Sequence, residues 1–159
     1  MAIDFPVTAA VRFLREKKVA FTPRLYNYVE HGGTGESAKQ LGLDEHAVIK
    51  TLVFETNEKK PLIVLMHGDR EVSTKNLARH LGLKSVEPAS ADRATKWTGY
   101  MFGGTSPFGT RAQMPIFVER TIFDLDRIFI NGGKRGFLVE IAPNVLHDMT
   151  RVETVEVGI

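Results

Sequence analysis

Two glycine-rich segments contain most of the residues whose types and spacing could do chemistry. The first, Thr98 to Gly109, reads TGYMFGGTSPFG, and its glycines and proline exclude a regular helix or an ordinary strand. Its paired glycines, Gly103 and Gly104, lack Cβ atoms, so successive backbone N–H groups could converge on an anion or a developing oxyanion. The same pair could equally form a tight turn that needs positive φ. Both interpretations stay open from composition alone.

Ser106 lies in the same segment, where a serine nucleophile could stand. The pattern differs from a G-x-S-x-G nucleophile elbow, because the second glycine comes one residue late. Pro107 follows Ser106 and has no N–H to donate to an oxyanion. We therefore expect a serine or threonine hydroxyl here to orient a substrate, or to serve a structural turn, and not to attack.

The second segment, Asn131 to Gly136, reads NGGKRG and separates two apolar runs, RIFI and FLVEI. Asn-Gly between two strands is a hairpin signal. The segment is not a Walker A loop, since its frame fails and no helix follows. Lys134 and Arg135 at its tip could clamp a phosphate, the arginine through two N–H groups at once. A solvated turn is the alternative.

Lys50 is the third candidate, because it interrupts the apolar run VIKTLVF. Alternation along a strand places Lys50 on the same face as Val48 and Leu52. Its side chain either extends into solvent at a sheet edge or points into a polar cavity.

Composition limits the classes of function. The chain has no cysteine, and its five histidines lack metal-ligand spacing, so we expect no metal site and no cofactor. No paired acidic motif supports an ordinary base-dependent hydrolase. With 21 basic and 19 acidic residues, the chain lacks the charge of a broad nucleic-acid coat, although a local basic rim is possible. No signal peptide or membrane-length apolar run is evident, which favours a soluble cytoplasmic protein.

The elements that must position these residues belong to one domain, because no linker-like stretch divides residues 1–159. Short helices are expected at 8–17, 37–42, 73–82, 90–99 and 143–149, with a glycine-rich turn at 31–37. Strands are expected at 20–28, 48–55, 62–67, 115–119, 127–132, 137–141 and 152–157, the second and third forming a hairpin. Strands outnumber helices without regular alternation. This predicts an α/β (α+β) fold with a mixed, curled sheet or pseudo-barrel and short outer helices.

Taken in order, VIKTLVF, TGYMFGGTSPFG and INGGKRGFLVEI resemble the YbaK/EbsC family of prolyl-tRNA synthetase-associated editing domains, which are aminoacyl-tRNA deacylases. No single motif is specific, but the three together cover most of the chain. The resemblance implies a freestanding hydrolase acting on the ester of a mischarged tRNA, most often Cys-tRNA(Pro) or another small amino acid on tRNA(Pro). It implies the tRNA acceptor end as partner, with prolyl-tRNA synthetase as a possible second partner. Carried over by position, the catalytic residues are Lys50, Gly103 and Gly104, and the substrate-binding residues are Tyr26, Thr105, Ser106, Pro107, Gly132, Gly133, Lys134, Arg135 and Gly136.

The implied mechanism needs no protein nucleophile, because an aminoacyl ester is already activated. Water could attack it, or the substrate's own thiol could release a thiolactone in a lyase-like step. One residue departs from the cysteine-editing pattern: an acid is expected two places after GGKRG, where this chain has Leu138, with Glu140 two further on. The edited amino acid therefore stays open. A small-molecule esterase and a non-catalytic tRNA- or nucleotide-binding module are the competing hypotheses.

Overall fold

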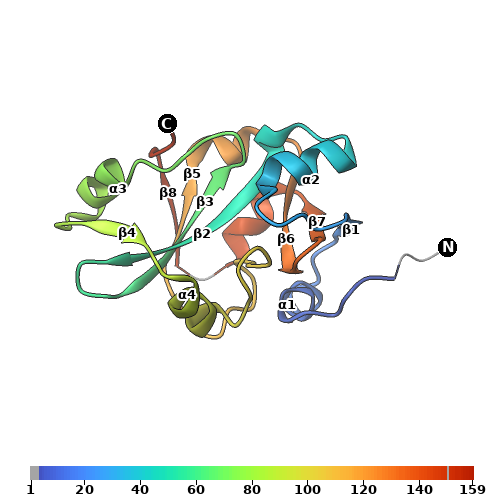
Figure 1. Cartoon of the computed structure of the whole chain (residues 1–159), viewed down its shortest axis with the longest axis horizontal. Helices are drawn as coiled ribbons and strands as arrows, with labels where there is room; N and C mark the ends of the chain where they lie inside the picture. The colour runs from blue at the N-terminus through green and yellow to red at the C-terminus, as the bar shows by residue number, and fades with distance from the viewer. Residues whose placement is uncertain (1–3, 150) are drawn as a thin grey trace.

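The hairpin expected from VIKTLVF and LIVLMH lies at the centre of a mixed eight-stranded sheet (Figure 1). The structure is a computed structural model that describes residues 4–149 and 151–159. Its two central strands, β2 (Val48–Thr56) and β3 (Pro61–His67), pair antiparallel. β-Branched and other apolar residues dominate both strands, as expected for strands that are covered on both faces.

The sheet is open and does not close into a barrel. Its order is β1-β7-β6-β2-β3-β5-β8, and the short strand β4 pairs with the far end of β2. The outer strands β1 and β8 lie at opposite ends of this order, so the curled sheet is confirmed and the pseudo-barrel is corrected. The pairs β2–β6, β3–β5 and β5–β8 are parallel. The remaining strands are β1 (Thr22–Leu25), β4 (Val86–Pro88), β5 (Ile116–Glu119), β6 (Ile128–Lys134), β7 (Phe137–Ile141) and β8 (Val152–Val155).

Short helices cover the sheet, and most of their ends are where sequence signals place them. Hydroxyl side chains cap three N-termini, and left-handed glycines end three helices. The caps are Thr8, Ser73 and Ser90, and the terminating glycines are Gly42, Gly82 and Gly99. The α-helices are α1 (Ala9–Glu16), α2 (Gly33–Leu41), α3 (Thr74–Leu81) and α4 (Ala91–Thr98), and the 3-10 helices are η1 (Glu45–Ala47), η2 (Arg120–Asp124) and η3 (Pro143–Asp148).

Some elements differ from their expected form. The helix α2 begins at Gly33, so most of the segment expected as a glycine-rich turn is helical. Tertiary contacts outweigh the poor helix propensity of glycine here, because the Thr34 hydroxyl donates to the Glu45 carboxylate at 2.8 Å and reaches the Gly68 carbonyl. Segment 143–149 forms a 3-10 helix instead of an α-helix, and β1 is shorter than expected. Strand β4 was not expected.

The two faces of the sheet carry different cores. One face packs against α1 and the segment that follows α4, and this main core includes Leu14, Ile63, Phe108 and Ile130. The opposite face carries two smaller cores, one with α3 and one with α2. In Figure 1, β2 crosses the view between α3 at the left and α2 at the right. The gap between these helices positions the candidate site.

Candidate active site

Lys50 projects into a cavity at the gap between the two smaller cores. Its strand neighbour Val48 belongs to the core beneath α2, and Leu52 packs on the core beneath α3. Lys50 shares their face by alternation and is half-buried among the residues that line a cavity of about 420 Å³. This volume suits a small organic ligand. Of the two orientations considered for Lys50, the structure shows the cavity and not a solvated sheet edge.

The cavity continues into a split between β2 and β6. These parallel strands pair only at Val48–Phe129 and Ile49–Ile130, and β4 joins the same edge of β2 from Phe54 onward. The Val53 carbonyl accepts from Ala89 on this edge, so the alternate residue Thr51 turns its own N–H and C=O toward the split.

Thr51 also has an unusual side chain. Its hydroxyl oxygen is buried and has no hydrogen-bond partner in the described part of the chain. An unsatisfied buried hydroxyl costs about 1–3 kcal/mol of stability. Thr51 is among the residues that line the cavity, where its backbone faces the split.

The N-terminus of α2 forms a second wall. Gly33, Thr34, Glu36 and Ser37 line the cavity there. First-turn N–H groups of a helix lack intrahelical acceptors and give this end a partial positive charge. Glu36 supplies the carboxylate among the lining residues and also accepts from Gln40 at 3.0 Å. This wall thus offers both backbone donors and one anionic group.

The loop after α4 supplies the third wall through a tight turn. The Gly104 N–H donates to the Met101 carbonyl at 2.8 Å, and Gly103 has a φ of 86°, which favours glycine. The Gly104 N–H is therefore already hydrogen-bonded within the turn. This corrects the expectation that both glycines present their N–H groups to a substrate. Gly103 lines the cavity, and its N–H donates no hydrogen bond within the described residues.

Gly104 instead allows close packing. A methyl group added there would lie 2.8 Å from the backbone nitrogen of Arg135. Ser106 is fully buried, and its hydroxyl oxygen accepts from the Phe108 N–H at 3.1 Å. Pro107 is buried too and borders a separate, smaller hollow. The structure therefore places Ser106 and Pro107 outside the cavity, in a structural turn.

The GGKRG segment also lies beside the cavity and not in its wall. Glycines at 132, 133 and 136 give room to Phe137, Tyr100 and the Tyr26 carbonyl, because an added methyl group would approach each within 2.4–2.8 Å. Lys134 and Arg135 are exposed at the rim. The preceding residue Asn131, which was not among the expected site residues, does line the cavity.

Four of the expected residues thus meet in the cavity: Tyr26, Lys50, Gly103 and Thr105. Burial raises the pKa of the Tyr26 hydroxyl. Leu138 is 4% exposed and lines the cavity as well. Glu140 is held by Arg24 and Arg127, and the hydrogen bond from Arg24 is the main cause of the lowered pKa of its carboxyl. Sequence reasoning missed Tyr28, Glu36, Thr51 and Phe102, since only the fold brings them together.

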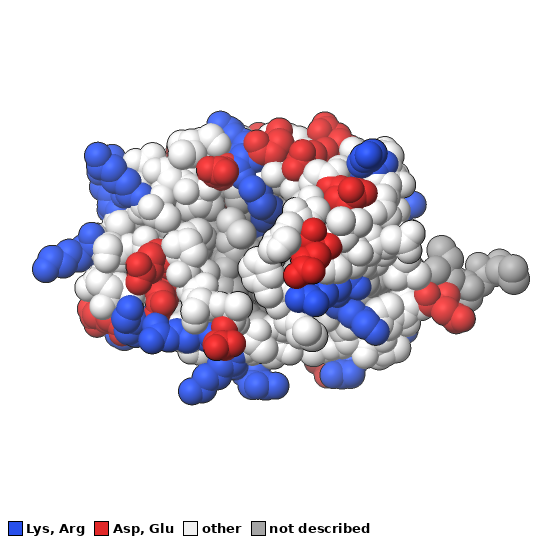
Figure 2. Space-filling view, viewed as in Figure 1, with Lys and Arg blue, Asp and Glu red and all other residues white. Residues whose placement is uncertain are grey.

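The lysine and arginine side chains around the cavity have no acidic partner in the described part of the chain. Within residues 4–149 and 151–159, Lys50, Lys134 and Arg135 have no carboxylate within 4.0 Å, whereas Arg24, Arg93 and Arg120 are paired. Figure 2 shows a hollow at the middle of this face, with lysine or arginine side chains on its border and acidic ones above it. Unpaired cations around a hollow favour an anionic ligand.

Comparison with known proteins decides the family. The sequence model of the aminoacyl-tRNA editing domain family matches residues 32–149. This range includes the whole cavity wall except Tyr26, Tyr28, Val29 and His31. The chain belongs to this family. It is 30% identical over 94% of its length to "Putative Cys-tRNA(Pro)/Cys-tRNA(Cys) deacylase EbsC" of Enterococcus faecalis, of which it covers 92%.

Two further comparisons concern a larger protein and a solved structure. A proline–tRNA ligase of Streptococcus equi subsp. zooepidemicus is 34% identical over 69% of the chain, which covers 18% of the ligase. A crystal structure described as "a putative trans-editing enzyme for prolyl tRNA synthetase" has a TM-score of 0.82 at 18% identity, over 98% of this chain and 99% of that one. The last likeness shows the fold. No helix in the described residues of this editing domain is long and apolar enough to span a membrane.

Proposed function

We propose that this chain is a freestanding deacylase that hydrolyses the ester between a small amino acid and the 3′-terminal adenosine of tRNA(Pro). The observation that carries the proposal is the cavity that Lys50, whose ammonium has no carboxylate partner among the described residues, lines together with Gly103, whose N–H is free of hydrogen bonds within those residues. EbsC and the editing domains of proline–tRNA ligases support the substrate class. The near-neutral chain favours contact with the acceptor end over a broad tRNA surface, so prolyl-tRNA synthetase would help to select the tRNA.

The reaction needs only a modest acceleration from the protein. An aminoacyl ester is activated enough to hydrolyse even without a catalyst, although slowly. One well-placed hydrogen-bond donor lowers the activation barrier by about 3 kcal/mol. Gly103 N–H would donate to the carbonyl oxygen as it becomes an oxyanion. The oxygen of a water molecule adds to the carbonyl carbon, the bond to the ribose oxygen breaks, and the proton lost by the water ends on that oxygen, which leaves as the ribose hydroxyl.

The attacking group would be water, or the thiol of a cysteinyl substrate. The chain has no cysteine, and the buried Ser106 hydroxyl is held in its turn. At the cavity wall, the hydroxyls of Thr34 and Ser37 donate to neighbouring oxygen atoms, so neither is set up as a nucleophile. With a cysteinyl substrate, thiol attack would release a thiolactone and the free tRNA.

We assign the two ends of the substrate from the positions of the charged groups. Lys50 would hold the terminal nucleotide or the ester carbonyl, where an ammonium can contact oxygen atoms. Glu36 would receive the α-ammonium group of the amino acid, since Leu138 offers no charge and Glu140 is occupied by two arginines. The apolar wall at Leu138 fits a small, uncharged side chain such as that of alanine or cysteine.

The decisive experiment compares deacylation of Cys-, Ala- and Ser-charged tRNA(Pro) by the wild type, Lys50→Ala and the control Lys75→Ala on the exposed surface of α3. We expect the rate with at least one substrate to fall about 100-fold in Lys50→Ala and to stay unchanged in the control. Equal rates for all three proteins would remove Lys50 from the mechanism. Turnover of simple esters without tRNA would favour an esterase, and binding without loss of the ester would favour a binding module.

A further inference from the structure

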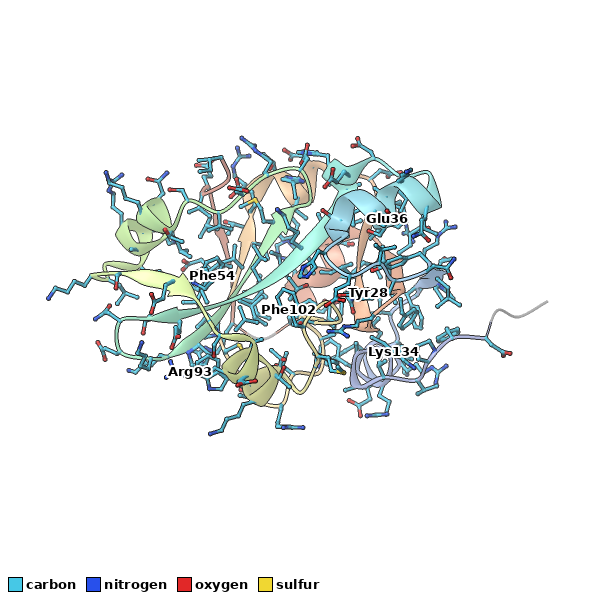
Figure 3. All side chains as sticks on the ribbon, viewed as in Figure 1. Tyr28, Glu36, Phe54, Arg93, Phe102 and Lys134 are labelled. Atoms are coloured by element: carbon cyan, nitrogen blue, oxygen red, sulfur yellow. The ribbon has the colours of Figure 1, made fainter. Side chains whose placement is uncertain are left out.

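Phe102 stands exposed at the mouth of the cavity. Its side chain is 66% exposed, and that of its neighbour Met101 is 63% exposed. Phe102 also lines the cavity. Figure 3 places Phe102 and Tyr28 close together, between Glu36 above and Lys134 below. A large aromatic group left in water beside an active site indicates a binding surface.

The fold holds Phe102 in place. It occupies the second position of the turn closed by the bond from Gly104 N–H to the Met101 carbonyl. The Arg135 Nε donates to the Phe102 carbonyl at 2.7 Å, which ties this turn to the β6–β7 hairpin. Gly104 packs directly on the hairpin backbone. The ring therefore projects from a backbone that is already fixed before a ligand binds.

Arg135 adds a cation to the same surface. Its guanidinium carbon lies 5.0 Å from the centroid of the Tyr28 ring, and no carboxylate of the described residues lies within 4.0 Å of it. Only its Nε is used by the Phe102 carbonyl. The two terminal nitrogens remain able to bind a phosphodiester group through paired hydrogen bonds. Lys134 is exposed next to it in the chain.

We propose that Phe102, Tyr28 and Arg135 form a nucleotide platform for the single-stranded 3′ end of the RNA, just before the terminal adenosine. A base would stack on Phe102 while its phosphate binds Arg135. This inference rests on the proposed function and adds to it the site that would hold the nucleotides outside the cavity. An exposed aromatic ring beside unpaired cations is the arrangement that binds single-stranded nucleic acid. A docked protein is the competing occupant, and the cations disfavour it.

The platform is tested first by binding. Phe102→Trp places a fluorescent ring at the platform, and Trp97 supplies the background signal of the wild type. The probe is the trinucleotide CCA, with adenosine monophosphate as control. We expect CCA to quench the new fluorescence and adenosine monophosphate to quench it far less. Equal quenching by both, or none by CCA, would overturn the platform, and this readout does not depend on deacylation.

Kinetics supply the second test. Phe102→Ser should raise KM about tenfold for aminoacylated RNA that ends in CCA and should raise it less for aminoacyl-adenosine, because that substrate lacks the nucleotide that stacks on the ring. Met101→Ser, a neighbour of similar exposure, is the matched control and should leave KM unchanged. Equal effects of both variants would instead indicate an apolar protein-docking surface. If the wild type deacylates neither substrate, the proposed function fails, while the fluorescence result still decides the platform.

Discussion

The Asn131 side chain donates from Nδ2 to the Gly103 carbonyl at 3.2 Å and so joins the two glycine-rich motifs of the sequence. Its Oδ1 also accepts from the N–H groups of Gly133 and Lys134. One amide side chain thereby fixes the orientation of the Gly103–Gly104 peptide, which follows the Gly103 N–H, against the β6–β7 hairpin. The position of Gly103 within the cavity depends on this contact.

Mutation can distinguish the role of the Asn131 amide nitrogen from that of its amide oxygen. Asn131→Asp keeps an oxygen for Gly133 and Lys134 but removes the donor to Gly103, so we expect kcat to fall about tenfold with a loss of unfolding free energy below about 1 kcal/mol. Asn131→Ala removes all three bonds and should lower both activity and stability. Deacylation rates and urea unfolding measure the two effects. If Asn131→Asp keeps full activity, the tie to Gly103 has no part in the reaction.

Alanine at each of the paired glycines should have distinct effects. At Gly104 the new methyl group meets the hairpin backbone, and we expect a loss of about 2 kcal/mol in stability. At Gly103 the new methyl group meets the end of the Tyr28 side chain, which can shift. Stability should therefore fall by only about 1 kcal/mol, because of the positive φ, while activity falls at least tenfold.

Gly82→Ala is the control for the glycine pair, because Gly82 also has positive φ but an added methyl group there meets nothing within 4 Å. It should match Gly103→Ala in stability and the wild type in activity. Thermal unfolding and deacylation rates report the comparison. Normal activity of Gly103→Ala would argue against a role of the Gly103 peptide in the cavity.

Stability should depend on pH through His67. This side chain is fully buried and stacks on His46, and burial is the main cause of a pKa below the ordinary value of 6.5. Its Nδ1 donates to the His46 carbonyl, and its Nε2 then accepts from the Thr121 hydroxyl. The folded state therefore favours the neutral imidazole ring. The unfolded chain therefore takes up the proton more readily. The stabilisation is complete above pH 6.5 and is lost as the pH falls below that value.

Melting temperatures at about pH 7.5 and about pH 5.5 test this dependence. The wild type should melt lower at the acidic pH, and His67→Gln should show a smaller difference between the two values. His31→Gln is the control, since the His31 side chain is 87% exposed and should leave the difference unchanged. An identical pH response in His67→Gln and wild type would contradict this assignment.

Glu36 and Leu138 should control the choice of amino acid. Glu36→Gln keeps size and hydrogen bonding but removes the charge proposed to bind the α-ammonium group, so kcat/KM should fall about tenfold for every aminoacyl substrate. Leu138→Asp restores the acid of the cysteine-editing pattern and should raise the ratio of Cys to Ala deacylation. The exposed Glu30 gives the control Glu30→Gln. If Glu36→Gln matches this control, the α-ammonium group binds elsewhere.

Much of the local structure follows from the sequence. Hydroxyl residues and glycines at fixed positions mark the helix ends, and alternating apolar residues mark the central hairpin, because these signals act through neighbours in the chain. Alternation also placed Lys50 on the face of Val48 and Leu52. The three motifs together indicated the family that the comparison shows.

The rest was decided by contacts between distant residues. Sequence alone determined the helix caps, the hairpin and the family motifs, since each depends on residues close together in the chain. Only the tertiary structure buried Ser106 and fixed the start of α2 through the contacts of Thr34 with Glu45 and Gly68. It also ends the pairing of β2 with β6 at Ile49, so that the Thr51 backbone faces the cavity. No local pattern encodes where two strands part, because that depends on what packs between them.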